Sequence, residues 1–168
     1  MLDELAAFSE LTKFNVIFIR EQGNFYSDKI QLLERKGINI IYLKGWKKIS
    51  LSKISFCFIF LIRHIKCFLN LHSFVYGIKS IGYFLKVDLE LFNDDKVDLH
   101  CQFATQSTIL GFIIKEYFKT NISYSFTYHA YDIFVKNLWF STLTANAEKV
   151  CSISNYNINY VKKHYLVV

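Results

Sequence analysis

Short runs of β-forming residues alternate along this chain with helical segments, and this alternation limits the fold more than any other feature. Residues 14–19 are rich in Val, Ile and Phe and predict a strand. Residues 25–36 predict a helix, and Gly37 stands at the position after it where glycine commonly ends a helix. Residues 38–43 predict a second strand, which completes a strand–helix–strand unit with parallel strands.

The same alternation continues in the second half of the chain. Strands are predicted at residues 97–103, 122–127 and 149–153, and helices at residues 106–118, 138–148 and 155–164. Thr105 and Ser154 stand where helix-capping side chains are expected, and residues 93–95 predict a turn. The length of 168 residues suits one domain, so the sequence predicts a single α/β domain over residues 1–168. We expect a mostly parallel sheet of about five strands with helices on both faces.

The segment from Lys44 to Lys86 (residues 44–86) differs from the rest because it has eight Lys or Arg residues, nine aromatic residues and no acidic residue. We expect one or two helices here. Three interpretations remain open for its charge: lysines that face solvent on ordinary helices, a patch that binds an anionic membrane surface, or a nucleic-acid surface. The last is disfavoured because only three of the chain's 20 basic residues are arginine, the side chain best suited to reading phosphates and bases.

Cellular location is predicted from the cysteines and from the uncharged runs. The four cysteines lack metal-binding spacing, which indicates scattered buried thiols in a reducing compartment. The uncharged runs of residues 54–62 and 67–78 fall well short of the roughly 20 apolar residues that a spanning helix needs. The chain is therefore expected in the cytoplasm, with the inner face of the membrane as one place it acts.

Polar side chains follow several predicted strands at the ends where an open parallel sheet binds its ligands. They form three clusters: the loop of residues 20–24 with Gly23, then His100 with Gln102, and then His129 with Asp132. This convergence predicts a binding site at the carboxyl edge of the sheet.

Three sequence blocks around these residues resemble one family. Residues 123–134, SYSFTYHAYDIF, resemble the "FSFTAHAYDIF" signature of the bacterial exopolysaccharide and lipopolysaccharide branch of family 4 glycosyltransferases. Residues 97–104, VDLHCQFA, are similar to that branch's "DHIHAHFA", and residues 150–161, VCSISNYNINYV, to its "VVTISEYNRRYL". The blocks agree in order and spacing. The resemblance implies the Rossmann-like N-terminal half of a GT-B fold.

The resemblance also implies roles for individual residues. His129 matches the histidine that contacts the transferred sugar, and we expect it to be catalytic. Asp132 either meets the acceptor or caps the backbone of its turn. His100 matches the first histidine of its block, whereas Gln102 replaces the second and cannot carry a proton at neutral pH. Gly23 would let its loop approach the acceptor or a diphosphate closely. We expect substrate to be bound by Gly23, His100, Gln102 and Asp132.

The reaction implied by the resemblance is transfer of a sugar from a nucleotide donor to a lipid-linked or polysaccharide acceptor, with retention of configuration. Such enzymes hold the donor's diphosphate in a C-terminal domain that carries a glutamate pair spaced E-x7-E, and no glutamates here have that spacing. We therefore expect a fragment that is inactive alone and that works with a separately encoded C-terminal domain. No metal is expected, since no DxD motif occurs, and no cofactor or nucleic-acid partner is expected either.

Two other classes of function remain open. One is a non-catalytic Rossmann-like interaction module that presents an exposed apolar face to a partner. The other is a peripheral membrane protein that acts through its basic segment alone.

Overall fold

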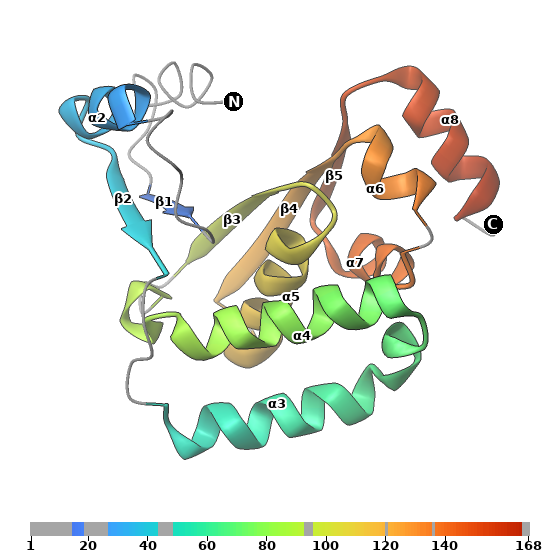
Figure 1. Ribbon diagram of the computed structural model, residues 1–168, viewed down its shortest axis with the longest axis horizontal. Helices are drawn as coiled ribbons and strands as arrows, with labels where there is room; N and C mark the ends of the chain where they lie inside the picture. Colours follow the sequence, from blue (N-terminus) through green and yellow to red (C-terminus); the bar gives the residue numbers. More distant parts are fainter. Residues whose placement is uncertain are drawn as a thin grey trace. The chain divides into compact units, whose positions relative to one another are not determined.

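The computed structural model describes residues 15–18, 27–43, 49–92, 96–119, 121–135 and 137–165 (Figure 1). The chain groups into two compact units, Met1–Gly45 and Trp46–Val168, and each is described by itself. It is an α/β protein whose described strands all pair in parallel.

The first unit contains the predicted strand–helix–strand arrangement. Strand β1 (Asn15–Phe18) pairs in parallel with β2 (Asn39–Tyr42), and helix α2 (Ser27–Arg35) connects them. Gly37 follows α2 with a φ of +80°, a backbone conformation that costs glycine little. Leu33 and Ile38 are buried on either side of this turn, so the helix end is fixed by both the glycine and packing.

The second unit contains a three-stranded parallel sheet in the order β3 (Val97–Gln102), β4 (Ile122–Tyr128) and β5 (Lys149–Ser152). Its remaining elements are α3 (Leu51–Arg63), η2 (Ile65–Phe68), α4 (Leu71–Lys86), η3 (Leu89–Phe92), α5 (Gln106–Phe118), α6 (Ala130–Phe134), α7 (Trp139–Asn146) and α8 (Asn155–His164). The predicted strands and long helices are thus confirmed, and residues 44–86 supply two helices. The predicted turn at residues 93–95 lies outside the described residues.

Two parts of the fold prediction differ from the structure. The described strands form one sheet of two and one of three, where a single sheet of about five was expected. In the three-stranded sheet, alternate residues of β4 are buried and α5 packs against β3 and β4. The opposite face has no buried residue, so the described part of this unit does not show helices on both faces. The reason lies in the sequence, because that face carries polar side chains.

The core of the second unit is built around Trp139, whose side chain is fully buried. Its indole ring stacks on Phe60 of α3, with ring centroids 5.8 Å apart, and meets Phe68 of η2 edge-on at 5.0 Å. Its Nε1–H donates to the carbonyl oxygen of Ser73 in α4 at 2.9 Å. One side chain of α7 therefore contacts all three elements of the basic segment and leaves no polar atom unpaired.

Lys53 shows that the basic segment is not uniformly a solvent-facing surface. This lysine of α3 is 5% exposed, and its ammonium group donates to the carbonyl oxygens of Val87 at 2.6 Å, Leu85 at 3.4 Å and Phe84 at 3.5 Å. These carbonyls lie at the carboxyl end of α4, where a cation is favoured by the helix dipole. The charge of Lys53 therefore stabilises the fold and is withdrawn from the surface.

His64 adds a titratable group to this aromatic core. Its ring centroid lies 4.5 Å from that of Phe60, 5.2 Å from Phe112 and 5.9 Å from Trp139. Its Nε2 is buried and has no hydrogen-bond partner in the described part of the chain. Burial lowers the pKa of His64 below its ordinary 6.5, and the nearby Glu116 opposes this shift.

The close approach of α4 to the core predicts a contrast between two glycines of the same helix. A Cβ at Gly77 would lie 2.4 Å from the ring of Phe68 and 3.0 Å from Trp139, whereas a Cβ at Gly82 meets nothing within 4 Å. Gly77→Ala should lower the free energy of unfolding by about 1–3 kcal/mol because buried Phe68 has no room to move. Gly82→Ala should raise it by up to about 1 kcal/mol through helix propensity. Urea unfolding measures both; equal effects would contradict the packing described.

The buried ring of His64 predicts a pH dependence of stability. The folded pKa is below the unfolded value, so below about pH 6.5 the unfolded chain binds more protons than the folded one. Stability should be full above that pH and fall as the pH drops through the folded pKa. His64→Phe should flatten the stability curve between about pH 7 and pH 5, apart from the share of His100, whose pKa burial also lowers. An unchanged slope in urea unfolding would count against this role.

Candidate functional site

The exposed face of the three-stranded sheet is lined by polar side chains in register. Asp98 of β3 is paired with Ser123 of β4, His100 with Ser125, and Gln102 with Thr127. Residues in register across parallel strands point to the same side of a sheet, so these pairs form three successive rows. Strand β5 adds Lys149 and Cys151 to the same face. We call this surface, made by the residues 98, 100, 102, 123, 125, 127, 149 and 151, the polar sheet face.

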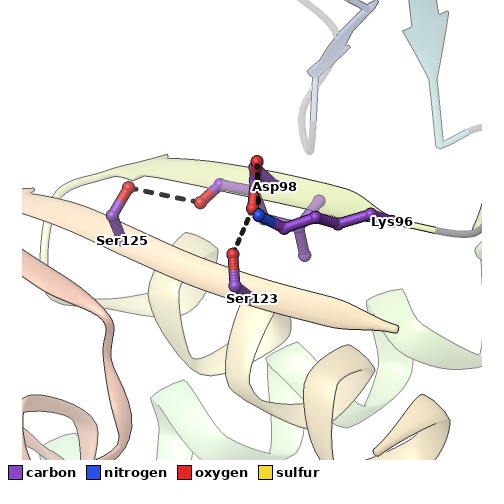
Figure 2. A network of polar contacts seen from close by, with 5 residues as sticks. Lys96, Asp98, Ser123 and Ser125 are labelled. Carbon is purple, nitrogen blue, oxygen red and sulfur yellow. Dashed lines mark hydrogen bonds and ion pairs between the residues drawn. The ribbon is translucent and has the colours of Figure 1, made fainter. Parts of the chain in front are cut away.

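The row nearest the amino end of β3 is joined by hydrogen bonds and by an ion pair (Figure 2). The hydroxyl of Ser123 donates to the carboxylate of Asp98, and Lys96 Nζ lies 4.0 Å from the other oxygen of that carboxylate. The hydroxyl of Ser125 donates to the carbonyl oxygen of Leu99 at 3.4 Å. Side chains of β4 therefore reach across to β3 along this face.

His100 is held between two hydroxyl groups of β4. Its Nδ1 lies 2.9 Å from Ser125 Oγ, and its Nε2 lies 3.2 Å from Thr127 Oγ1. A neutral imidazole donates at one nitrogen and accepts at the other, which suits hydroxyls because they do both. Partial burial among these side chains lowers the pKa of His100, which favours the neutral form of the ring. The arrangement fixes the plane of the ring at a position two residues before the end of β3.

His129 is the first residue after β4 and precedes helix α6. Its ring packs against that of Phe103, with centroids 4.5 Å apart, and its Nε2 has no hydrogen-bond partner among the described residues. Its backbone N–H donates to Asp132 Oδ2 at 2.8 Å. The backbone of His129 is extended and continues the alternation of β4, on the side of Thr127.

Phe103, the residue after β3, has a backbone conformation that is unusual for its type. Its φ is +70°, in the left-handed region that a bulky side chain seldom adopts. Hydrogen bonds hold it there: its N–H donates to the carbonyl oxygen of Thr127 at 2.9 Å, and its own carbonyl accepts from Thr108 Oγ1 at 2.6 Å. The turn presents the Phe103 ring to His129 and leaves it 45% exposed. Sequence reasoning did not single out this residue, although it lies inside the block of residues 97–104.

The structure brings most of the predicted site residues to one end of one sheet. Gln102 ends β3, His129 follows β4, and His100 lies two residues back on the polar sheet face. Asp132 is also close, but it is 2% exposed, and the carboxylate oxygen that is bonded caps the backbone of His129. Of its two predicted roles, the structure shows the capping one. Gly23 lies outside the described residues.

Burial also affects the ionisation of Asp132. The pKa of this carboxyl is raised above its ordinary 3.8 by burial, while the backbone N–H of His129 acts in the opposite direction. Such a group serves as a positioning residue, because it fixes the turn from which the His129 ring projects.

Exposed apolar side chains surround this end of the sheet. Tyr131 and Phe134 belong to α6, Ile153 follows β5, and Tyr156 lies in α8, and all four are exposed. Phe134 also contacts Tyr160 of α8 edge-on at 4.7 Å. The edge therefore offers both hydrogen-bonding groups and apolar surface.

Metal ligation has no support in the described residues, where no group of three His, Cys, Asp or Glu side chains is placed to hold an ion. Comparison with known proteins gives no assignment either: no protein-family model, no curated protein and no solved structure matches the chain significantly.

The cysteines predict a labelling experiment that reports on the polar sheet face. Cys151 is exposed, whereas Cys57, Cys67 and Cys101 are buried, and burial raises the pKa of Cys57 to about 11 and of Cys101 to about 12. Because the thiolate is the reactive form, the native protein should react rapidly at one thiol and at least about 100-fold more slowly at the others. Timed alkylation with mass spectrometry measures this. Cys151→Ser should abolish the fast phase, and a fast phase that persists would contradict the burial of the other three cysteines.

Proposed function

We propose that the second unit is the acceptor side of a retaining glycosyltransferase of GT-B type, from the polysaccharide-synthesising branch of family 4. It would transfer a sugar from a nucleotide donor to a lipid-linked or polysaccharide acceptor. The single observation that supports this most is where the three sequence blocks fall. Residues 97–104 form β3 and its turn, residues 123–134 form β4 and α6, and residues 150–161 lie on β5 and α8. The blocks occupy three adjacent strands and the turns after them.

The polar groups at this edge suit recognition of a sugar. In the proposed reaction, a hydroxyl of the acceptor forms a bond to the anomeric carbon, the bond from that carbon to the diphosphate breaks, and the acceptor's proton passes to the leaving diphosphate oxygen. The ring of His129 would donate or accept a hydrogen bond to a hydroxyl of the transferred sugar through Nε2, which is buried in this structure and would have to become accessible when the sugar binds. His100 and Gln102 would contact the acceptor. Asp132 would act indirectly, by holding the turn of His129.

The leaving diphosphate gains negative charge as this bond breaks, and its stabilisation is a large part of catalysis. In enzymes of this kind a second domain holds the nucleotide diphosphate. The proposed division of labour therefore gives this chain the acceptor and His129, and gives the second domain the donor. On this proposal the chain has no transferase activity unless that domain is supplied, which can be checked with a labelled nucleotide sugar.

A second candidate is a non-catalytic interaction module, and the exposed apolar residues Tyr131, Phe134, Ile153 and Tyr156 favour it. These side chains would pack against a partner protein at the edge where the transferase hypothesis puts the second domain. The two candidates differ in what they bind. A module would bind a partner protein without any response to sugars, whereas the transferase half responds to the acceptor at His129.

The transferase hypothesis predicts the behaviour of two histidine variants when the chain is joined to a nucleotide-sugar-binding domain from a related glycosyltransferase. His129→Ala should lower the rate of sugar transfer by about 100-fold or more, the usual cost of losing one preorganised hydrogen-bonding group. It should lower the free energy of unfolding by only about 1 kcal/mol, through loss of the contact with Phe103. Transfer rate and thermal midpoint are measured together.

His164→Ala is the matched control, because His164 is exposed in α8 and contacts only its helix neighbour Tyr160 among the rings described. It should leave the transfer rate within about twofold of the wild type, as expected of a surface substitution. If His129→Ala is folded and transfers sugar as fast as His164→Ala, the catalytic assignment fails.

A further inference from the structure

Helix α3 has a buried side that packs on the core and, opposite to it, an exposed side that carries large apolar residues. Its inward side is buried and is formed by Lys53, Cys57 and Phe60, at the three- and four-residue spacing that puts side chains on one helix face. Its outward side repeats the same spacing with large apolar residues. We call this side the α3 outer face, and it consists of Leu51, Ile54, Phe58, Ile59 and Ile62.

The α3 outer face is left uncovered. Its five side chains are between 50% and 81% exposed, the most exposed being Leu51. Apolar exposure continues beyond the helix at Ile65 and at Leu69, which are 58% and 75% exposed. Scattered apolar residues are ordinary on a protein surface, but five large apolar side chains on one side of a helix, interrupted only by the exposed Ser55, indicate a surface that another apolar surface covers.

The charged residues of the segment 44–86 indicate what kind of surface would cover the α3 outer face. Residues 44–86 contain no acidic residue, and Lys66 and Lys79 are exposed within the described part of this segment. The exposed Arg63 meets a carboxylate, Glu116, but that residue belongs to α5. The segment therefore brings positive charges to its surface and no negative charge of its own.

A second copy of the chain would be a poor cover for this surface. In a two-fold symmetric dimer the same patch meets itself, so the lysines of both copies would approach each other without a carboxylate from the segment between them. An anionic lipid surface supplies the missing charge together with an apolar layer that accepts Phe58 and Ile62.

The dimensions of α3 fit binding in the plane of the membrane. Its 13 residues extend about 20 Å, which is shorter than the hydrocarbon core of a bilayer. In the described part of the chain, none of the helices has the length and apolar character required to traverse a bilayer. A helix that lies flat can bury one side among lipid chains while its other side stays packed on α4 and α5.

We propose that the α3 outer face inserts into the interface of an anionic membrane and holds the protein there. Inward packing through Phe60 and Trp139 keeps the helix folded in water, so the apolar stripe is presented before the protein meets lipid. This inference does not depend on the transferase proposal, since it concerns a helix remote in sequence from the residues of the candidate site.

The test uses the full chain and vesicles made of equal parts phosphatidylglycerol and phosphatidylcholine, with no sugar acceptor. The double variant Phe58→Ser with Ile62→Ser should bind these vesicles at least about 10-fold more weakly than the wild type, because two large apolar anchors are removed. The matched control is Ile153→Ser with Tyr156→Ser, which alters two side chains of similar exposure, 59% and 68%, outside the stripe. The control should bind within about twofold of the wild type. Thermal unfolding verifies that both variants are folded.

Lipid charge is varied in a second series. Pure phosphatidylcholine vesicles should bind the wild-type protein at least about 10-fold more weakly at about 0.1 M salt, and Lys66→Glu should weaken binding to the anionic vesicles. Equal binding to neutral and anionic vesicles overturns the proposal, as does a double variant that binds like the wild type. The proposal is also overturned if the wild-type protein does not bind vesicles but forms a dimer without lipid, and the double variant dissociates that dimer. That result would assign the α3 outer face to contact with a second copy. Because no acceptor is present, none of these outcomes bears on the transferase proposal.

Discussion

The packing of Trp139 is the interaction on which the second unit depends. A single indole ring touches α3, η2 and α4, and its one polar atom is satisfied by Ser73 of α4. Removing such a ring would open a cavity among aromatic neighbours, and burying any polar substitute would leave a donor or acceptor unpaired. Helix α4 passes close to this ring and to Phe68 at Gly77, where a Cβ would contact both side chains. These contacts tie α3, η2 and α4 to α7 in one arrangement.

Element positions could be predicted well from the sequence, because strand and helix periodicities are local properties. The alternation of β4 and the glycine after α2 are read directly from neighbouring residues. The division into two sheets depends on which strands meet, which is set by contacts far apart in sequence.

Capping was only partly predictable. Ser154 accepts a bond from Asn157 N–H as expected, whereas the side chain of Thr105 makes no capping bond, and Thr108 bonds the preceding turn instead.

The candidate site shows the same limit. His100, Gln102 and His129 could be assigned to one edge because residues at the ends of parallel strands gather there. The choice between two roles for Asp132 could not be made from sequence, because it depends on whether the carboxylate turns inward. The two hydroxyl partners of His100 follow from the register of β3 and β4, which the sequence does not specify. The role of Phe103 could not be predicted, because a phenylalanine in a sequence does not indicate a positive φ.

In the turn at Phe103, the backbone conformation and the side-chain contact favour different residue types at the same position. Its backbone favours glycine or asparagine, which tolerate the left-handed conformation, while the contact with the ring of His129 favours an aromatic side chain. A phenylalanine that keeps the ring accepts the backbone strain, which is of order 1–3 kcal/mol for such conformations. Replacement by glycine would therefore relax the chain and at the same time free the imidazole to rotate. Fold stability and the orientation of His129 are thus coupled through one residue, so a more stable protein can be obtained here only with a less ordered site.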